Sequence, residues 1–182
     1  MSRLPQILPE DMDLEQAEVY KSINSGIRGR TGGPFTPLLY SPTLTSRVEQ
    51  LGVYIRFESA VPVRQREMVI CMISAQWSAD FEWYVHAPLA LEAGLPSASL
   101  DMIGLQQVPV LDDTADRAAH AFTHELLETK QVSDETYACA AQVFGDKGVV
   151  DLTGLIGYYS LLAMTLNTFQ VDVPEDARIP WA

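Results

Sequence analysis

Residues 63–95 decide the fold of this chain, and they read VRQREMVICMISAQWSADFEWYVHAPLALEAGL. The first half, as far as residue 77 or 78, is apolar on nearly every side of a helix. A helix with that pattern is buried over most of its surface. The second half continues over residues 79–93 and stops at Gly94, since glycine is favoured just beyond a helix C-terminus. We therefore expect two consecutive buried helices here.

The rest of the chain is punctuated by proline and glycine, and no run alternates as a β-strand would. Pro42 and Pro62 stand where proline is favoured, at the start of a helix. The pattern predicts an all-α, single-domain helical bundle over residues 1–182, with about seven to eight helices. The expected segments span about residues 14–27, 42–59, 62–78, 79–93, 96–103, 112–130, 133–144 and 148–169.

The composition is that of a globular protein, with 47% hydrophobic and 20% charged residues in a chain of 182. The net charge of −12 would repel phosphate backbones and anionic lipids, and no Lys/Arg cluster opposes it. We therefore expect no nucleic-acid partner. Residues 1–10 lack the apolar run of a signal peptide, so a cytoplasmic location is expected.

One apolar segment has the length of a membrane span. Residues 152–171 contain no charged residue, and twenty such residues could cross a bilayer. The segment also contains several polar residues, and Asp151 and Asp172 flank it without a basic anchor. We interpret it as a buried helix of the bundle or of a subunit interface, with no membrane partner.

Two polar stripes interrupt the helices of residues 63–95. In the second helix Glu82 and His86 are four residues apart, so a carboxylate and an imidazole meet on one face. Burial would desolvate this pair, and titratable groups with displaced pKa values concentrate at functional sites. An ordinary surface pair is the alternative. The stripe of the first helix consists of Glu67, Cys71, Ser74 and Ser78.

These residues resemble the carboxymuconolactone decarboxylase family, which includes the alkylhydroperoxidase D-like proteins. The likeness rests on an R-E-x-[VI]-[IV] helix followed by an E-W-x-x-H-x-x-x-A-x-x-x-G helix. It implies a helical bundle of the alkylhydroperoxidase D-like type, with a core at about residues 40–170 and irregular tails. It also implies a homo-oligomer, either a trimer or a hexamer. The matching residues are Arg66 to Ile70, Glu82, Trp83, His86, Ala90 and Gly94, with Ser41, Pro42, Leu44, Gly157, Tyr158, Tyr159 and Asn167 in the flanks.

The chain departs from the peroxidase branch of that family. That branch carries a C-x-x-C whose second cysteine stands four residues before the histidine. In this chain Glu67 and His86 match the branch's glutamate and histidine, whereas Ala79 and Glu82 occupy the cysteine positions. Disulfide-type peroxide reduction needs a reactive thiolate and a resolving thiol, so this chemistry is not expected.

The resemblance implies an enzyme that performs acid–base chemistry, decarboxylation or a related step, on a small carboxylated molecule. Loss of CO₂ leaves an enolate-like carbon that must take up a proton. We predict His86 as the proton donor, oriented by Glu82 and tuned by Glu67. Arg64 or Arg66 could hold the substrate carboxylate, although a surface or interface salt bridge explains each of them equally well.

Two other functions remain open, an alkylhydroperoxidase-like antioxidant protein and a non-catalytic oligomeric module that binds a ligand. His120 and His124 are four apart and could ligate zinc, but the apolar stripe of their helix points away. We favour a solvated face or a subunit contact, and expect no metal and no cofactor. Cys71 and Cys139 are expected to be free and buried. The candidate pocket-lining residues are Cys71, Ser74, Ser78, Trp83 and Tyr158.

Overall fold

The computed structural model describes residues 2–27, 29 and 31–181. Within these ranges the chain forms α-helices, one 3-10 helix (η1) and one π-helical turn (η2), and no β-strand. The all-α prediction is confirmed, as is the expected number of helices. The elements are η1 (Pro9–Asp11), α1 (Leu14–Ser25), α2 (Phe35–Leu38), α3 (Pro42–Val53), η2 (Tyr54–Glu58), α4 (Val63–Trp77), α5 (Asp80–Glu92), α6 (Ser97–Gly104), α7 (Thr114–Thr129) and α8 (Asp134–Phe169).

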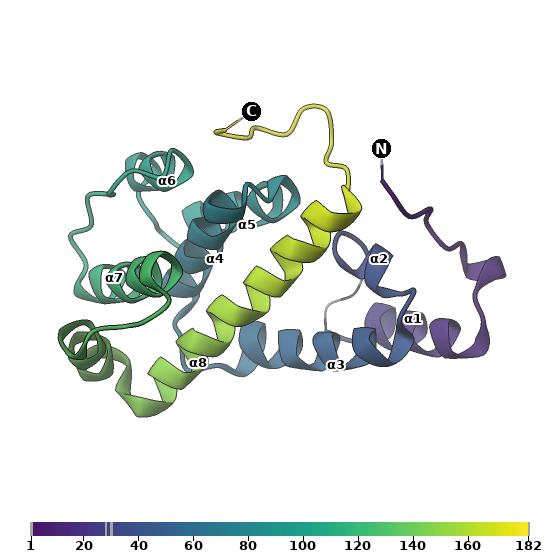
Figure 1. Cartoon of the computed structure of the whole chain (residues 1–182), viewed down its shortest axis with the longest axis horizontal. Helices are drawn as coiled ribbons and strands as arrows, with labels where there is room; N and C mark the ends of the chain where they lie inside the picture. The colour runs from purple at the N-terminus through teal and green to yellow at the C-terminus, as the bar shows by residue number, and fades with distance from the viewer. Residues whose placement is uncertain (1, 28, 30, 182) are drawn as a thin grey trace.

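The helix α4 lies at the centre of the molecule, where it packs against α5, α6, α7 and α8. Figure 1 shows α8 crossing the molecule diagonally, with α4 and α5 beside it and α6 and α7 on one side of them. The helices α1, α2 and α3 lie on the other side. Residues 67–75 of α4 are all buried, as its apolar sequence predicts. This central position brings the polar stripe of α4 into the interior.

Local sequence signals explain where several helices begin and end. Asp13 accepts a hydrogen bond from the Gln16 N–H and forms a capping box at α1, and the Ser133 hydroxyl accepts from the Thr136 N–H at the start of α8. Gly94 has φ +90° directly after α5 and its cap residue, which confirms the predicted stop. Burial and capping together therefore define most of the helix bounds that the sequence pattern indicates.

Three segments differ from the predicted helices. The expected helix over residues 42–59 is regular only to Val53, and its last turn is the π-helical η2. The expected helices over residues 133–144 and 148–169 are joined in α8, which has a non-helical Gly145 (φ 67°, ψ 172°) at the break. The short helix α2 lies outside every segment that the sequence pattern predicted to be helical.

The helix α8 is, among the described helices, the one long and apolar enough to cross a membrane by length and composition. In this structure 56% of its most apolar window is buried inside the protein, largely against α4 and α7. Packing in the bundle core therefore accounts for the buried part of this apolar segment.

The two cysteines are both free, but they differ in exposure. Cys71 is completely buried in α4, as expected, whereas Cys139 is exposed on α8. The expected burial of Cys139 is therefore wrong. The next residue, Ala140, is the one that turns into the core, because the first turns of α8 are covered on one side only.

Candidate active site

The connection between α4 and α5 is what brings the two polar stripes together. Ser78 ends α4 in the left-handed conformation (φ 47°), and α5 begins at Asp80. The Ala79 N–H donates back to the Ser74 carbonyl over 2.8 Å and tightens this turn. The chain therefore reverses within a few residues, and α5 returns along α4 as its most extensive packing partner.

Glu67, Glu82 and His86 converge in the interior. The His86 Nδ1 lies 2.6 Å from a Glu67 carboxylate oxygen, and the His86 Nε2 lies 3.4 Å from a Glu82 carboxylate oxygen. The three side chains are 2%, 4% and 3% exposed for Glu67, Glu82 and His86. The sequence predicted this convergence, and the alternative of an ordinary surface pair does not apply.

The two carboxylates stand in the opposite order from the one expected. The sequence placed Glu82 as the residue that orients His86, because the two are four apart on one helix. The shorter contact is made by Glu67 from the neighbouring helix, and Glu82 makes a longer one. Helix-to-helix packing decides these distances, and sequence spacing cannot give them.

Glu67 is held in its ionised form. Burial works to raise its pKa, but the hydrogen bond to His86 and the positive charges of His86 and Arg66 outweigh burial and leave the pKa below its ordinary value. Arg66 Nε donates to the second oxygen of this carboxylate over 3.2 Å. A carboxylate at 2.6 Å places a proton on the His86 Nδ1, so the Nε2 atom is the one left to exchange protons.

A cavity of about 300 Å³ lies beside the His86 ring. One part of its wall consists of polar side chains, and another part consists of large apolar side chains. A loop over residues 31–34 completes the wall. The polar residues are Arg56, Glu82, His86 and Tyr159, and the apolar residues are Phe35, Phe81, Val85 and Leu162.

Tyr159 is a part of this site that the sequence did not single out as a site residue. Its ring meets the His86 ring edge-on, with centroids 5.2 Å apart and an interplanar angle of 86°. Burial, and then the negative charge of Glu82, raises the pKa of the Tyr159 hydroxyl well above its ordinary value. The phenol therefore remains a hydrogen-bond donor at neutral pH.

The candidate pocket-lining residues lie elsewhere, and this expectation is corrected. Cys71 is buried in the core, and the Ser74 hydroxyl donates to the Ile70 carbonyl of its own helix over 2.8 Å. Ser78 belongs to a separate surface hollow. The remaining two pack in aromatic clusters: Trp83 meets Trp181 edge-on with centroids 5.3 Å apart, and Tyr158 meets Tyr159 at 5.2 Å.

The Cys71 thiol interacts electrostatically with the carboxylates of the site, but it is not reactive. Burial, followed by the negative charges of Glu67 and Glu82, raises its pKa well above its ordinary value. The nucleophile in thiol chemistry is the thiolate, and a buried thiol with a raised pKa supplies almost none of it at neutral pH.

The arginine on the cavity wall is also different from the two considered from the sequence. Arg64 forms an ion pair with the buried Asp116, and Arg66 pairs with Glu67, so both are engaged within the bundle. Arg56 in η2 lines the cavity instead. No motif marked it, because residues 42–59 read as one regular helix.

The ends of η2 are held by a buried carboxylate of α8. Tyr54, the first residue of η2, donates its hydroxyl to one Asp151 oxygen over 2.8 Å. The Ala60 N–H, two residues beyond η2, and the Lys147 ammonium each donate to the other oxygen over 2.7 Å. Asp151 therefore fixes the segment that presents Arg56.

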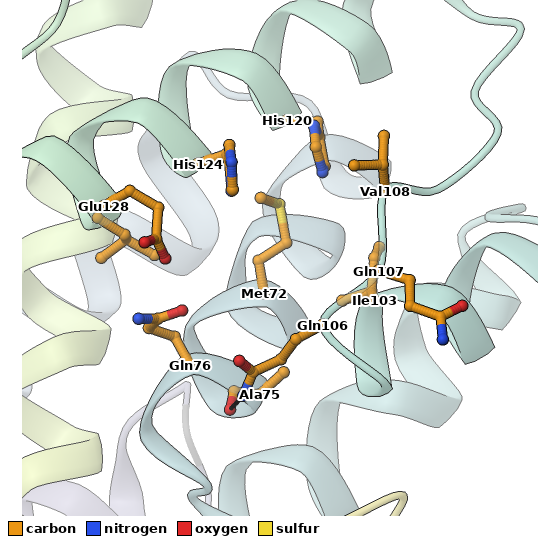
Figure 2. Close-up of a pocket in the computed structure, with 11 residues that line it drawn as sticks. Met72, Ala75, Gln76, Ile103, Gln106, Gln107, Val108, His120, His124 and Glu128 are labelled. Carbon is orange, nitrogen blue, oxygen red and sulfur yellow. Dashed lines mark hydrogen bonds between the residues drawn. The ribbon is translucent and has the colours of Figure 1, made fainter.

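The histidines of α7 line a second, smaller cavity of about 90 Å³ (Figure 2). The His120 and His124 rings are stacked, with centroids 5.8 Å apart and an interplanar angle of 12°. Burial, and then the charge of His124, lowers the pKa of His120. Figure 2 shows Met72 near the two rings and Glu128 beyond His124, on the side away from His120. No group of three or more His, Cys, Asp or Glu suited to a metal occurs in the part of the chain that the structure describes.

Comparisons with known proteins show the fold. No known family model matches the sequence, and no curated protein matches it. An AhpD-core, uncharacterized peroxidase-related protein from Ralstonia eutropha JMP134 superposes with a TM-score of 0.76 at 13% identity, covering 96% of this chain and 93% of that one. An uncharacterized peroxidase-related protein from Silicibacter sp. TM1040 gives 0.71 at 11% identity, covering 97% and 95%. The debrominase Bmp8, in complex with 2,3,4-tribromopyrrole, gives 0.72 at 14% identity, covering 100% and 98%.

These matches extend over nearly the whole of each chain, so they confirm the predicted alkylhydroperoxidase D-like fold. Identities of 11%, 13% and 14% carry no information about the reaction that this chain performs. Any function must therefore be argued from the site itself.

Proposed function

We propose that the chain is an enzyme that performs acid–base chemistry, decarboxylation or a related step, on a small carboxylated molecule. The observation that supports this most directly is the position of His86, which lies between two buried carboxylates at the wall of a cavity. Such a histidine is oriented and can take up or release a proton at one defined atom.

His86 transfers the proton through Nε2. Glu67 accepts from the Nδ1–H and fixes the orientation of the ring. Glu82 lies 3.4 Å from Nε2, a contact loose enough for a ligand atom to compete with it. When the bond to the departing CO₂ breaks, its electron pair remains on the substrate carbon, and the Nε2 proton moves to that carbon. A positioned acid of this kind contributes about 10²- to 10⁴-fold in rate.

Disulfide-type peroxidase chemistry is the weaker alternative. Ala79 and Glu82 stand where that branch has its cysteines, and Cys71 is a buried, protonated thiol. Cys139 is exposed on α8 and is not among the residues that line the cavity beside His86. The described residues therefore offer no pair of thiols at this site for attack and resolution.

The proposal is tested with a panel of β-keto acids and lactone carboxylates, following CO₂ release and exchange of carbon-bound protons in D₂O by NMR. His86→Gln keeps the bulk and hydrogen bonding of the ring but cannot carry the proton, so turnover should fall by about 10²- to 10⁴-fold. His124→Gln, the same change at an exposed histidine of α7, is the matched control.

A folded His86→Gln variant that retains wild-type turnover would remove His86 from the mechanism. Absence of both turnover and exchange for every acid in the panel would contradict the proposed reaction class. Loss of the folded state in His86→Gln, measured by circular dichroism, would make His86 a structural histidine and would also contradict the proposal.

We also propose that the chain forms a homo-oligomer, either a trimer or a hexamer. Apolar side chains of α8 stand exposed on the isolated chain, including Val150 at 69% and Met164 at 45%. Light scattering after size exclusion should give three or six times the 20.1 kDa chain mass, and the mass of a monomer or a dimer would refute the proposal.

A further inference from the structure

Arg56 has the features of an anion-binding residue. It lines the cavity beside His86, and its Nε–H is buried without a hydrogen-bond partner. A buried donor in that state costs free energy, and the cost is greater when the group is charged. The guanidinium makes a cation–π contact with Phe57, at 5.3 Å from the ring centroid, and no carboxylate among the described residues forms an ion pair with it.

The backbone around Arg56 has an unusual conformation that places its side chain at the cavity. Short π-helical turns are rare and occur often at functional sites, because they redirect side chains from the regular helix positions. Here η2 forms the last turn of the helix that begins as α3, and it carries Arg56 to the wall of the cavity. The hydrogen bonds to Asp151 from Tyr54, at the start of η2, and from Ala60, just beyond its end, hold both sides of the turn.

A second donor faces the same cavity. Tyr159 lines this cavity. Burial raises the pKa of its hydroxyl and the positive charge of Arg56 lowers it, so the two groups lie close enough to interact electrostatically. A guanidinium presents Nε–H and a terminal N–H side by side, which matches the two oxygens of a carboxylate. The phenol can donate a third hydrogen bond.

The apolar part of the cavity wall indicates what the rest of the ligand is like. The four large apolar side chains of the cavity cannot bind a second charged group of a ligand. They can pack against a compact apolar body of the size of one ring. Gly33 brings the loop directly against this wall, since a Cβ at that position would lie 2.2 Å from the Phe81 ring.

We propose that Arg56, presented by η2, is the residue that binds the ligand carboxylate at this site and selects ring-sized carboxylates over neutral molecules of the same shape. This inference rests on the proposed function, because it concerns the same cavity, but it concerns binding alone. A ligand held in this way has its body beside the His86 ring.

The test compares benzoate with benzamide, which has the same shape and no charge. Dissociation constants are measured by calorimetry for the wild-type protein and for Arg56→Gln, Arg56→Lys and Arg47→Gln. Arg47 is an exposed arginine of α3, so its variant controls for the loss of one surface positive charge. The Arg56 Nε–H signal in nitrogen-15 NMR spectra of the wild type reports the contact directly.

Benzoate should bind and shift the Arg56 Nε–H signal, whereas benzamide should bind at least tenfold more weakly, on the order of the loss of one charge-assisted hydrogen bond. Arg56→Gln should raise the benzoate dissociation constant by about 10- to 100-fold, because the positive charge and the pair of parallel N–H donors are both lost. Arg56→Lys should fall between, and Arg47→Gln should remain within about twofold of the wild type, because exposed charges are screened.

Equal binding of benzoate and benzamide, or no benzoate binding at millimolar concentration, overturns the inference. So does wild-type affinity in a folded Arg56→Gln variant. If Arg56→Gln does not fold, the wild-type NMR signal and Arg56→Lys decide, and an unshifted signal or an unchanged Arg56→Lys affinity overturns it. Because no turnover is measured, failure here leaves the His86 experiment intact, and failure of that experiment leaves this one intact.

Discussion

Glu67→Gln is the substitution that most directly probes the electrostatics of the site. Glutamine keeps the size of the side chain and an oxygen that can accept from the His86 Nδ1–H. It removes the negative charge that pairs with His86 at 2.6 Å and with Arg66 at 3.2 Å. It also places an NH₂ group where one of these two donors needs an acceptor.

The structure allows the magnitude to be worked out. A buried hydrogen bond to a charged group contributes about 1.5 to 3 kcal/mol to the free energy of unfolding. For a chain of this size each kcal/mol changes Tm by about 2 to 4 °C. Glu67→Gln should therefore lower Tm at pH 7 by roughly 3 to 12 °C. Glu18→Gln, at an exposed position of α1, is the matched control and should melt close to the wild type.

The sign of the pH dependence follows from the direction of the pKa shift. The folded pKa of Glu67 lies below its ordinary value of 4.5, so its ionised form stabilises the fold above that pH. This contribution is lost as the pH falls through the folded pKa. The Tm difference between wild type and Glu67→Gln should therefore be constant near pH 7 and shrink below pH 4.5.

Thermal melts by circular dichroism over a pH series measure this difference, with Glu18→Gln measured beside it. A Glu67→Gln variant that melts within the control's range at pH 7 would show that the buried pair does not stabilise the fold. A Tm difference that grows as the pH falls below 4.5 would contradict the direction of the Glu67 pKa shift.

Two further outcomes are expected from the same structure. Cys139 is exposed and Cys71 is completely buried, so a thiol reagent should label Cys139 in the native protein and Cys71 only after unfolding. Rapid labelling of both thiols in the native protein, or a disulfide between them after peroxide treatment, would refute this. Gly33→Ala should lower both Tm and benzoate affinity, because φ is +57° and the new Cβ meets Phe81. Gly94→Ala shares the positive φ (+90°) but has no atom within 4 Å, so it should lower Tm without weakening benzoate binding, and equal losses of affinity would count against the predicted contact.

The sequence by itself determined the helical character of this chain and the residues at the centre of its site. Helix periodicity and the positions of proline and glycine are local properties, so they predicted most of the elements before any contact was known. The pairing of Glu82 with His86 is also local, because residues four apart share a helix face. Glu67 stands on the polar stripe of the preceding helix, and the family resemblance suggested its part in the site.

Tertiary structure decided which partners these residues meet. The short Glu67–His86 contact depends on how α4 and α5 are rotated against each other, and no spacing along one helix contains that rotation. The same holds for Tyr159, which turns toward the cavity while its neighbour Tyr158 turns into the core. Adjacent residues on a helix face directions about 100° apart, and only packing decides which of them lines the cavity.

Arg56 was beyond sequence reasoning for a related reason. Its segment has the pattern of an ordinary helix. The π-helical turn that presents it at the cavity is held on both sides by Asp151, nearly a hundred residues later. A hydrogen bond over that separation is a property of the folded chain. The sequence determined which groups are available, and the packing of α8 against η2 decided that one of them faces the cavity beside His86.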